Sequence, residues 1–356
     1  MNPSKKPKTI LVAPLHWGLG HAARCIPIIR SLLEQGYNVV LASDGGALSL
    51  LKHEFPYLDS LELPSYAIEY PKKDSNFKLK LLMNLPHIGK TISRERKLIK
   101  KLVKDGRIDG IISDNRLGVY SKKIPSVYLT HQLNVLSGNT SWFSSKAHQK
   151  VIKKFNECWV PDIEGAGNLS GKLGHLKKPT FSIKYIGPLS RMIRRELPVK
   201  YDFMCLLSGP EPQRSILERK FIETFSVLDK KVLIVQGVVD VQKTKEIQGN
   251  ITLINFLTTK DLEKVINESE IILSRSGYTT IMDIAAMRKK AYFIPTPGQY
   301  EQEYLANRLK LQRVVPSCKQ EDFSIEKLNE ISEFKGFKDV DSNYKPEYLF
   351  RLFQSK

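Results

Sequence analysis

The chain has 356 residues, of which 41% are hydrophobic and 26% are charged, so it is long enough for two folded domains and is not an intrinsically disordered protein. Its 56 Lys and Arg residues exceed its 37 Asp and Glu residues, and the formal net charge of +19 indicates an anionic partner. The four cysteines form no CxxC pair and no zinc-type cluster, which argues against disulfides and structural zinc and favours a cytoplasmic protein.

The first predicted element is a buried strand over 9–13, whose apolar run is too short for a signal sequence or a membrane span. A glycine turn and a predicted helix over 22–35 follow it. The turn contains four candidate ligand-binding residues: His16, Gly18, Gly20 and His21. In a parallel α/β sheet such a turn lies at the ligand-binding edge, and the helix N-terminus directs N–H groups toward it. A plain strand-to-helix turn without a ligand is the alternative.

The stretch 72–107 contains twelve Lys and Arg residues against three acidic ones, a local charge of +9. Leucines and isoleucines are interleaved with these cations, a pattern that predicts basic amphipathic helices lying on an anionic membrane surface. A solvated face over an ordinary core stripe is the alternative interpretation. Nucleic acid is not an expected partner, because the chain contains no RRM, KH, zinc-finger or basic-zipper motif.

Strand-like and helix-like patterns alternate along the whole chain. Further strands are predicted over 38–43, 110–113, 126–130 and 157–160, and in the second half over 203–207, 231–236, 252–254, 271–274 and 291–295. Helices are predicted over 211–228, 259–268, 279–287 and 301–310. Continuous apolar strands separated by helices predict α/β architecture with parallel sheets that are buried on both faces.

A Gly-Pro strand end and a basic, proline-ended segment predict an interdomain linker over 187–199. We therefore expect an N-terminal Rossmann-like domain over 1–190, a C-terminal Rossmann-like domain over 191–340, and an active site in the cleft between them. The remaining residues, 341–356, contain an amphipathic segment that is expected to dock on the first domain or to form a loose surface helix.

Three segments of the second half have the character of a nucleotide site. Ser208 and Gly209 form a small-residue turn after one strand, and Arg275-Ser276-Gly277 form another, with Asp283 two helical turns later. Such turns place backbone N–H groups against a diphosphate, although Ser or Thr in this position often simply caps the helix. The third segment is the proline-rich loop over 295–299, which leads into Gln302 and Glu303.

Together these motifs resemble GT-B glycosyltransferases, and most closely glycosyltransferase family 28, the group that includes the lipid II-forming N-acetylglucosaminyltransferase. The resemblance is strong over about 270–310 and moderate over 9–36. It implies a GT-B fold with two Rossmann-like domains facing across a cleft. It also implies that the Arg275-Ser276-Gly277 turn handles the donor nucleotide, with Gly277 and Thr279 at its phosphates and Asp283 at its ribose. Gln302 and Glu303 are implied to hydrogen-bond the sugar, and Phe256 is expected near the base, which is expected to be uracil. Ser208 and Gly209, the other small-residue turn, are expected against the diphosphate. This chain has Asp283 where glutamate is usual and Glu303 in place of a second glutamine.

The first domain resembles the same family in its Gly-x-Gly-His turn. His131-Gln132-Leu133-Asn134 also resembles the family's His-Glu-Gln-Asn loop, but Gln132 replaces the glutamate and cannot act as a base. The remaining base candidates are His21, His16 and Asp114, the last of which ends a predicted strand. His131 is expected on the acceptor side or as a structural histidine. Arg24 is expected either to reach a phosphate or to lie at the surface or beside an acidic neighbour.

The resulting prediction is an inverting, metal-independent glycosyltransferase of hexosyltransferase type. His21, oriented by Asp114, would deprotonate a hydroxyl acceptor that attacks a UDP-sugar. A lipid-linked acceptor at the inner face of the plasma membrane is one form that this acceptor could take. The nucleotide-sugar is a co-substrate, and no cofactor is expected. Two alternatives stay open: a GT-B nucleotide-sugar hydrolase or epimerase, and a non-catalytic nucleotide-sugar-binding subunit.

Overall fold

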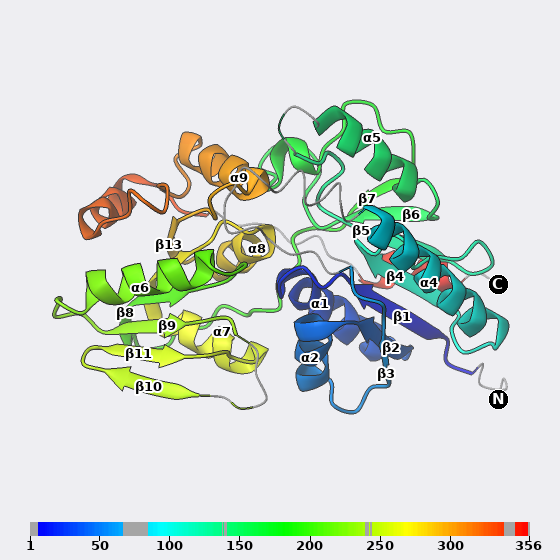
Figure 1. The fold of residues 1–356 in the computed structure, drawn as a ribbon, viewed down its shortest axis with the longest axis horizontal. Coiled ribbons are helices and arrows are strands. Elements are labelled where there is room, and N and C mark those ends of the chain that lie inside the picture. The colour runs from blue at the N-terminus through cyan, green and yellow to red at the C-terminus, as the bar shows by residue number, and fades with distance from the viewer. Residues whose placement is uncertain are drawn as a thin grey trace. The chain divides into compact units, whose positions relative to one another are not determined.

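The computed structural model describes residues 6–66, 85–136, 138, 141–238, 242, 244–337 and 346–354. They divide into two compact units (Figure 1), and the second comprises the described residues from 190 to 337. The first comprises the described residues up to 189 together with 346–354. Residues 67–84 lie outside the described part, so the beginning of the basic stretch 72–107 is not described.

The first unit is built on a seven-stranded parallel sheet in the order β3-β2-β1-β4-β5-β6-β7. The strands are β1 Thr9–Pro14, β2 Asn38–Ser43, β3 Ser60–Glu62, β4 Gly110–Asp114, β5 Ser126–Leu129, β6 Glu157–Val160 and β7 Ile183–Tyr185. The helices are α1 Gly20–Glu34, α2 Gly45–Glu54, α4 Leu85–Lys104 and α5 Ser141–Ile152. The strand order reverses between β1 and β4, so the ligand-binding crevice of this sheet is expected at their carboxyl ends.

The second unit has a six-stranded sheet in the order β10-β11-β9-β8-β12-β13, in which only β10 runs antiparallel to its neighbour among the described strands. Its strands are β8 Tyr201–Leu206, β9 Val232–Val235, β10 Lys245–Gln248, β11 Ile251–Ile254, β12 Ser269–Ser274 and β13 Lys290–Phe293. Its helices are α6 Gln213–Phe225, α7 Thr259–Asn267, α8 Tyr278–Met287, α9 Tyr300–Leu311 and the 3₁₀ segment η3 Ile325–Glu333. Here the order reverses between β8 and β12.

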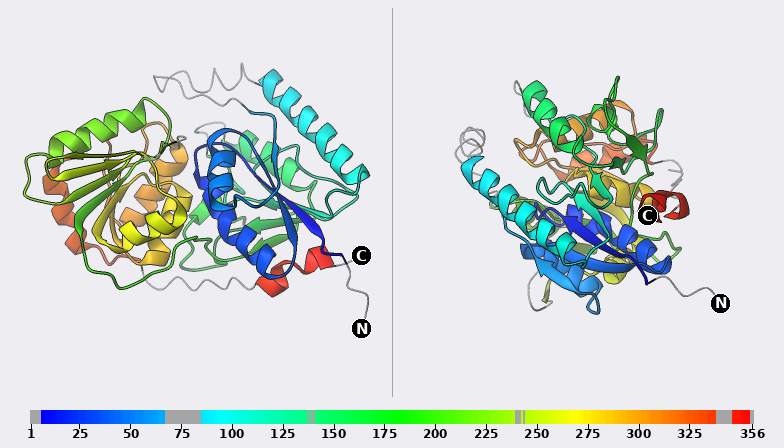
Figure 2. Two further views of the ribbon diagram at one scale, coloured as in Figure 1. Left: turned by 90° about the horizontal axis from the view of Figure 1, so that it is seen from below. Right: turned by 90° about the vertical axis from the view of Figure 1, so that its right-hand side faces the viewer.

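Helices cover both faces of the second sheet (Figure 2). Leu217, Phe221 and Phe225 of α6 pack with Leu328 and Ile331 of η3 on one face, over apolar side chains of the central strands. The prediction of an α/β fold with two Rossmann-like sheets is therefore confirmed, and the predicted strands coincide with the observed ones to within two residues.

The chain returns to the first unit at its end. Two fully buried phenylalanines lie here: Phe350, between the short helices α10 Pro346–Leu349 and α11 Arg351–Gln354, and Phe353, within α11. The Phe353 ring centroid lies 6.2 Å from that of Trp159, and Lys8 Nζ donates a 2.8 Å hydrogen bond to the Phe353 carbonyl. A Cβ atom on Gly110 would come within 2.5 Å of the Phe353 ring. The C-terminal residues therefore complete the core of the first unit.

We predict that Phe353→Ala lowers the free energy of unfolding of the first unit by about 3 kcal/mol, because it empties a fully buried aromatic site. All three tryptophans, Trp17, Trp142 and Trp159, belong to this unit, so urea unfolding followed by tryptophan fluorescence reports on it. Tyr348→Ala, at a side chain that is 56% exposed, is the control and should change stability by less than about 0.5 kcal/mol. Equal effects of the two substitutions would contradict the docking role of Phe353.

Candidate active site

Residues from three strand ends meet at the carboxyl edge of the first sheet. Pro14 at the end of β1 is in register with Asp114 at the end of β4, beside the point where the strand order reverses. The chain turns after β1 through Gly18, whose positive φ of 73° suits glycine, and α1 then begins at Gly20. His21 and Arg24 lie three residues apart in α1 and so share one helix face, which is the face that meets Asp114.

Asp114 is the centre of this cluster and is fully buried. His21 Nδ1 lies 2.8 Å from Asp114 Oδ1. Arg24 donates from Nε to Asp114 Oδ2 at 2.5 Å and also donates from Nη2 to Oδ1, so the contact is bidentate. The Arg24 guanidinium, only 1% exposed, also places Nη1 2.8 Å from Nδ1 of His131. One carboxylate therefore contacts two side chains of α1, and one of them, Arg24, also contacts His131 in the loop after β5.

The charges around Asp114 keep its carboxylate ionised. Burial alone would raise the pKa of Asp114, but the positive charge of Arg24 and the contact with His21 outweigh burial and lower this pKa to about 2. Asp114 consequently accepts hydrogen bonds at neutral pH and does not itself act as an acid.

The contacts also assign the protonated nitrogen of His21. A carboxylate can only accept, so Nδ1 of His21 holds the proton and donates it to Asp114. Arg24 Nη2, which can only donate, lies 2.9 Å from the same Nδ1, and this contact by itself would favour the opposite tautomer. The proton is assigned to Nδ1 because its contact with the Asp114 carboxylate, at 2.8 Å, is the shorter of the two and joins it to an anion. This tautomer leaves Nε2 of His21 as the nitrogen that can accept a proton, in a side chain that is 13% exposed.

A second buried cluster lies beside the first one and involves the other histidine of the turn. His16 Nδ1 is 3.5 Å from Asp44 Oδ2, and a Cβ on Gly45 would overlap the His16 ring. Asp44 also forms an ion pair with Arg116, whose Nη1 donates to Glu95 at 2.8 Å. His16 thus lies against a carboxylate that already has a cationic partner.

Sequence reasoning did not identify Asp44, Arg116 or Glu95 as members of this edge. Arg116 is fully buried, and its Nε also donates to the Pro14 carbonyl at 3.0 Å, which holds the strand end that precedes the His16 turn. Asp44 follows a predicted strand directly and Arg116 lies three residues after another, and a position just beyond a strand end is the signal that could have indicated them.

The predicted donor turns of the second unit follow β8 and β12, which are adjacent strands with Leu206 in register with Ser274. Gly209 has φ of 97°, and Thr296 Oγ1 lies 3.5 Å from the position of a Cβ there, so the turn after β8 lies near the proline-rich loop. The N-cap residue of α8 is Gly277, which has no side chain with which to cap the helix.

Several predicted donor residues instead hold these loops in place. Arg275 is fully buried and donates to the carbonyls of Ile294, Pro295 and Gln213 and, at 2.6 Å, to Gln320 Oε1. The Arg275 guanidinium thus ties three segments of the unit together. Ser276 is also fully buried, and its Oγ donates to the Gln302 carbonyl at 2.8 Å. The predicted donor contacts of Arg275 and Ser276 remain predictions.

Gln302 and Glu303 shape the proline-rich loop. Gln302 Oε1 accepts from the Thr296 backbone N–H at 2.8 Å, and Glu303 Oε1 accepts from that of Gly298 at 3.0 Å. Asp283 is buried and accepts a 2.7 Å hydrogen bond from Ser190 Oγ, and burial raises its pKa. Phe256 is buried just after β11. Their predicted contacts with sugar, ribose and base remain predictions.

Residues 213–333 match the Glycosyltransferase family 28 C-terminal domain. An uncharacterized glycosyltransferase of Methanosarcina mazei is 24% identical, with 90% of this chain and 89% of the relative covered. The UDP-N-acetylglucosamine--N-acetylmuramyl-(pentapeptide) pyrophosphoryl-undecaprenol N-acetylglucosamine transferase of Buchnera aphidicola is 26% identical, with 80% and 77% covered.

Among solved structures, the glycosyltransferase of kitacinnamycin superposes with a TM-score of 0.61 at 13% identity, covering 98% of this chain and 94% of that chain. MurG of Acinetobacter baumannii superposes with a TM-score of 0.54 at 14% identity, covering 98% and 99%. At this level of identity the superpositions establish the fold, which is GT-B.

We predict that Asp114→Asn lowers the free energy of unfolding of the first unit by about 3 kcal/mol at pH 7, because it leaves the buried Arg24 without its anionic partner. The folded-state pKa of Asp114, about 2, lies below the ordinary value near 3.9, so this carboxylate stabilises the fold above pH 4 and loses that effect as the pH falls toward 2. The difference from wild type should therefore shrink in acid.

Urea unfolding followed by tryptophan fluorescence at pH 7, 5 and 3 measures this difference. Asp59→Asn, at an exposed aspartate of the same unit, is the matched control and should show little difference at any of the three pH values. A deficit for Asp114→Asn that stayed constant from pH 7 to pH 3 would show that the ionised form of Asp114 is not the stabilising one.

Proposed function

Because the chain is a glycosyltransferase of the GT-B superfamily with a family 28 C-terminal domain, we propose that it moves a sugar from a nucleotide-sugar, a UDP-sugar, to a hydroxyl acceptor with inversion at the anomeric carbon. The observation that carries this proposal is the 2.8 Å contact between His21 Nδ1 and Asp114, because it leaves the other ring nitrogen of His21 ready to accept a proton.

In the proposed reaction the acceptor hydroxyl transfers its proton to Nε2 of His21 while its oxygen attacks the anomeric carbon. The bond from that carbon to the diphosphate oxygen breaks, and the nucleoside diphosphate leaves with the bonding electrons. Asp114 stays an anion throughout and stabilises the imidazolium that forms. Arg24 holds the carboxylate in place from its second side and has no role in proton transfer.

The donor is proposed to bind in the second unit. Backbone N–H groups at the turns of Ser208–Gly209 and Gly277–Thr279, together with the N-terminal end of α8, suit a diphosphate and its developing negative charge without a metal ion. Asp283 and Phe256 are proposed for the ribose and the base. Gln302 and Glu303 are proposed to face the sugar across the loop that they hold. The UDP-sugar in the name of the Buchnera relative supports this donor class.

His21→Ala should lower the turnover of the donor by about 10²–10⁴-fold and leave UDP binding unchanged, because it removes the base but no donor contact. A calorimetric screen with UDP-, dTDP- and GDP-sugars first identifies the donor, and turnover is then followed as nucleoside diphosphate release with a panel of hydroxyl acceptors. His53→Ala, at an exposed histidine of α2, is the control and should behave as wild type.

The same assay separates the alternative functions. Rapid release of nucleoside diphosphate without any acceptor would replace the transferase proposal by a hydrolase. A purified protein that binds a nucleotide-sugar and turns it over neither with nor without acceptors would be a binding subunit. If His21→Ala kept full transfer activity, the assignment of the base would be wrong.

We also propose that the protein binds peripherally to an anionic membrane, and that electrostatic attraction alone supplies this binding. The apolar stripe of α4 is used inside the first unit, where Ile99 and Leu102 are buried in the core and Glu95 binds Arg116. The solvated-face interpretation therefore accounts for this stripe. The opposite face of α4 exposes a row of cations: Lys90, Arg94, Lys97, Lys100, Lys101 and Lys104. Within the described residues, no helix combines the length and apolar character needed to cross a bilayer.

Replacing Lys97, Lys100, Lys101 and Lys104 by Gln should reduce binding to phosphatidylglycerol vesicles at least tenfold, since each cation near an anionic surface contributes about 1 kcal/mol. Co-sedimentation at low and high salt measures this binding. Replacing Lys245, Lys260, Lys319 and Lys335, four exposed lysines of the second unit, by Gln removes the same charge and should change it little. Equal losses in both quadruple variants would point to net charge alone rather than to α4.

A further inference from the structure

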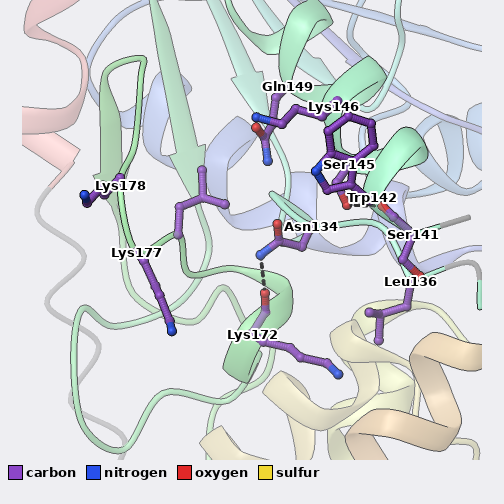
Figure 3. A pocket seen from close by; sticks show the side chains of 11 residues that line it. Asn134, Leu136, Ser141, Trp142, Ser145, Lys146, Gln149, Lys172, Lys177 and Lys178 are labelled. Atoms are coloured by element: carbon purple, nitrogen blue, oxygen red, sulfur yellow. Dashed lines mark hydrogen bonds between the residues drawn. The ribbon is translucent and has the colours of Figure 1, made fainter. Parts of the chain in front are cut away.

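A hollow of the first unit lies on the same loop as His131 and is not used by the proposed chemistry. It has a volume of about 390 Å³ and is formed by the loop after β5, by α5 and by the segment 172–178 after β6 (Figure 3). The side chains that matter for the argument are Asn134, Trp142, Lys146, Lys172, Lys177 and Lys178. We call this hollow the lysine pocket.

The lysine pocket is strongly cationic. Four of its lining residues are exposed lysines, and none of the described residues that line it is acidic. In Figure 3 the side chain of Asn134 lies between those of Lys146 and Lys172. Figure 3 shows the four ammonium groups directed away from one another, so they give the rim of the hollow a positive charge without forming one common binding point. Such a rim attracts an anion, and lysine is a common ligand of phosphate groups.

Hydrogen bonds hold the walls of the lysine pocket together. Asn134 Nδ2 donates to the Lys172 carbonyl at 2.7 Å, and the Asn134 backbone N–H donates to the Leu173 carbonyl at 2.9 Å. Gln149 Nε2 of α5 donates to the Leu133 carbonyl at 3.1 Å. The loop after β5 is thus joined both to α5 and to the lysine-bearing segment, so the pocket is formed before any ligand arrives.

One wall of the lysine pocket is aromatic. Trp142 is 65% exposed, and its ring centroid lies 4.9 Å from that of Phe143, which is 72% exposed. Large exposed aromatic side chains beside a polar hollow are typical of ligand-contact sites, and an indole offers a flat apolar face together with one N–H donor. A cationic pocket beside such a face suits a sugar that bears a phosphate better than a free inorganic anion.

The lysine pocket is close to the proposed base along the chain. Asn134 follows His131 by three residues, which limits the separation of their Cα atoms to about 11 Å, and His131 contacts the Arg24 that orders Asp114. The lysine pocket therefore lies on the loop that also contacts the His21–Arg24–Asp114 cluster, and this shared loop is the reason for assigning its ligand to the acceptor.

We propose that the lysine pocket binds the phosphate group of a phosphorylated sugar, which is the acceptor of the reaction. The identification of this ligand as the acceptor rests on the proposed function, whereas the binding of a phosphate in the lysine pocket does not. The phosphate is either that of a soluble sugar phosphate or the headgroup phosphate of a lipid-linked sugar, and the two sources present the same chemistry to the lysines.

Calorimetric titration with N-acetylglucosamine 1-phosphate, and with N-acetylglucosamine as the uncharged probe, tests the proposal on the full chain. The variant Lys172→Gln/Lys177→Gln/Lys178→Gln should weaken binding of the phosphorylated probe at least tenfold. The matched control, Lys122→Gln/Lys123→Gln/Lys153→Gln, removes three exposed lysines of the same unit that do not line the pocket and should bind as wild type. Tryptophan fluorescence verifies that both variants are folded.

A parallel arm uses phosphatidylglycerol vesicles and so tests the lipid source. The lipid source is supported if the pocket variant loses vesicle binding, its control does not, and the wild type does not bind the soluble probe. The ligand of the lysine pocket would then be a lipid phosphate. Binding of the soluble probe that depends on the three lysines supports the lysine pocket with a free sugar phosphate as its ligand. Equal affinity of wild type and pocket variant for both probes, or binding of neither probe by wild type, overturns the proposal.

The titration needs no turnover, so its failure is distinct from failure of the proposed function. Lysine-dependent binding of the sugar phosphate by a protein that never consumes a nucleotide-sugar would leave the pocket intact and remove the transferase proposal. The reverse result, transfer that depends on His21 but not on the three lysines, would keep the transferase and remove the pocket.

Discussion

The first unit depends on one buried carboxylate, Asp114, and on the guanidinium of Arg24, which donates a hydrogen bond to each of its two oxygens. A carboxylate with no exposed surface is stable only when opposite charge and hydrogen bonds replace the water it has lost, and here Arg24 and His21 supply both. Because the partners come from α1, the interaction also fixes how the first helix meets the sheet edge. The contacts that stabilise the Asp114 carboxylate in the interior therefore also orient His21, which is partly exposed.

A similar arrangement recurs beside it, where Arg116 holds Asp44 and Glu95 below the His16 turn. The edge of the first sheet is thus built from two buried ion clusters, each centred on a residue at or just after the end of β4. In the second unit the corresponding edge has a different construction, because Arg275 binds mainly backbone carbonyls and Gln302 and Glu303 bind backbone N–H groups. One edge thus presents side chains, whereas the other fixes the backbone of its loops, which is what a proton acceptor and a phosphate site respectively require.

The sequence predicted the fold well because strands buried on both faces leave continuous apolar runs, as at 38–43 and 157–160, where prediction and structure coincide. It missed β3 and β10 because these short edge strands are largely exposed and leave no such run. It placed His21 and Asp114 together but left the position of Arg24 open, since a charged residue usually indicates a surface. Arg116 was missed for the same reason. Its partners at 44 and 95 are far away in sequence, and no local pattern encodes a contact of that range.

The return of the last helix to the first unit sets an order of events during synthesis. Phe350 and Phe353 enter the core beside Tyr37 and Trp159, yet the ribosome makes them only after the whole second unit. Domains generally fold as they emerge, N-terminal first. Here part of the core of the first sheet, around Gly110, is supplied by residues that are made after the second unit. That core can therefore be completed only after residues 350–353 have been synthesised.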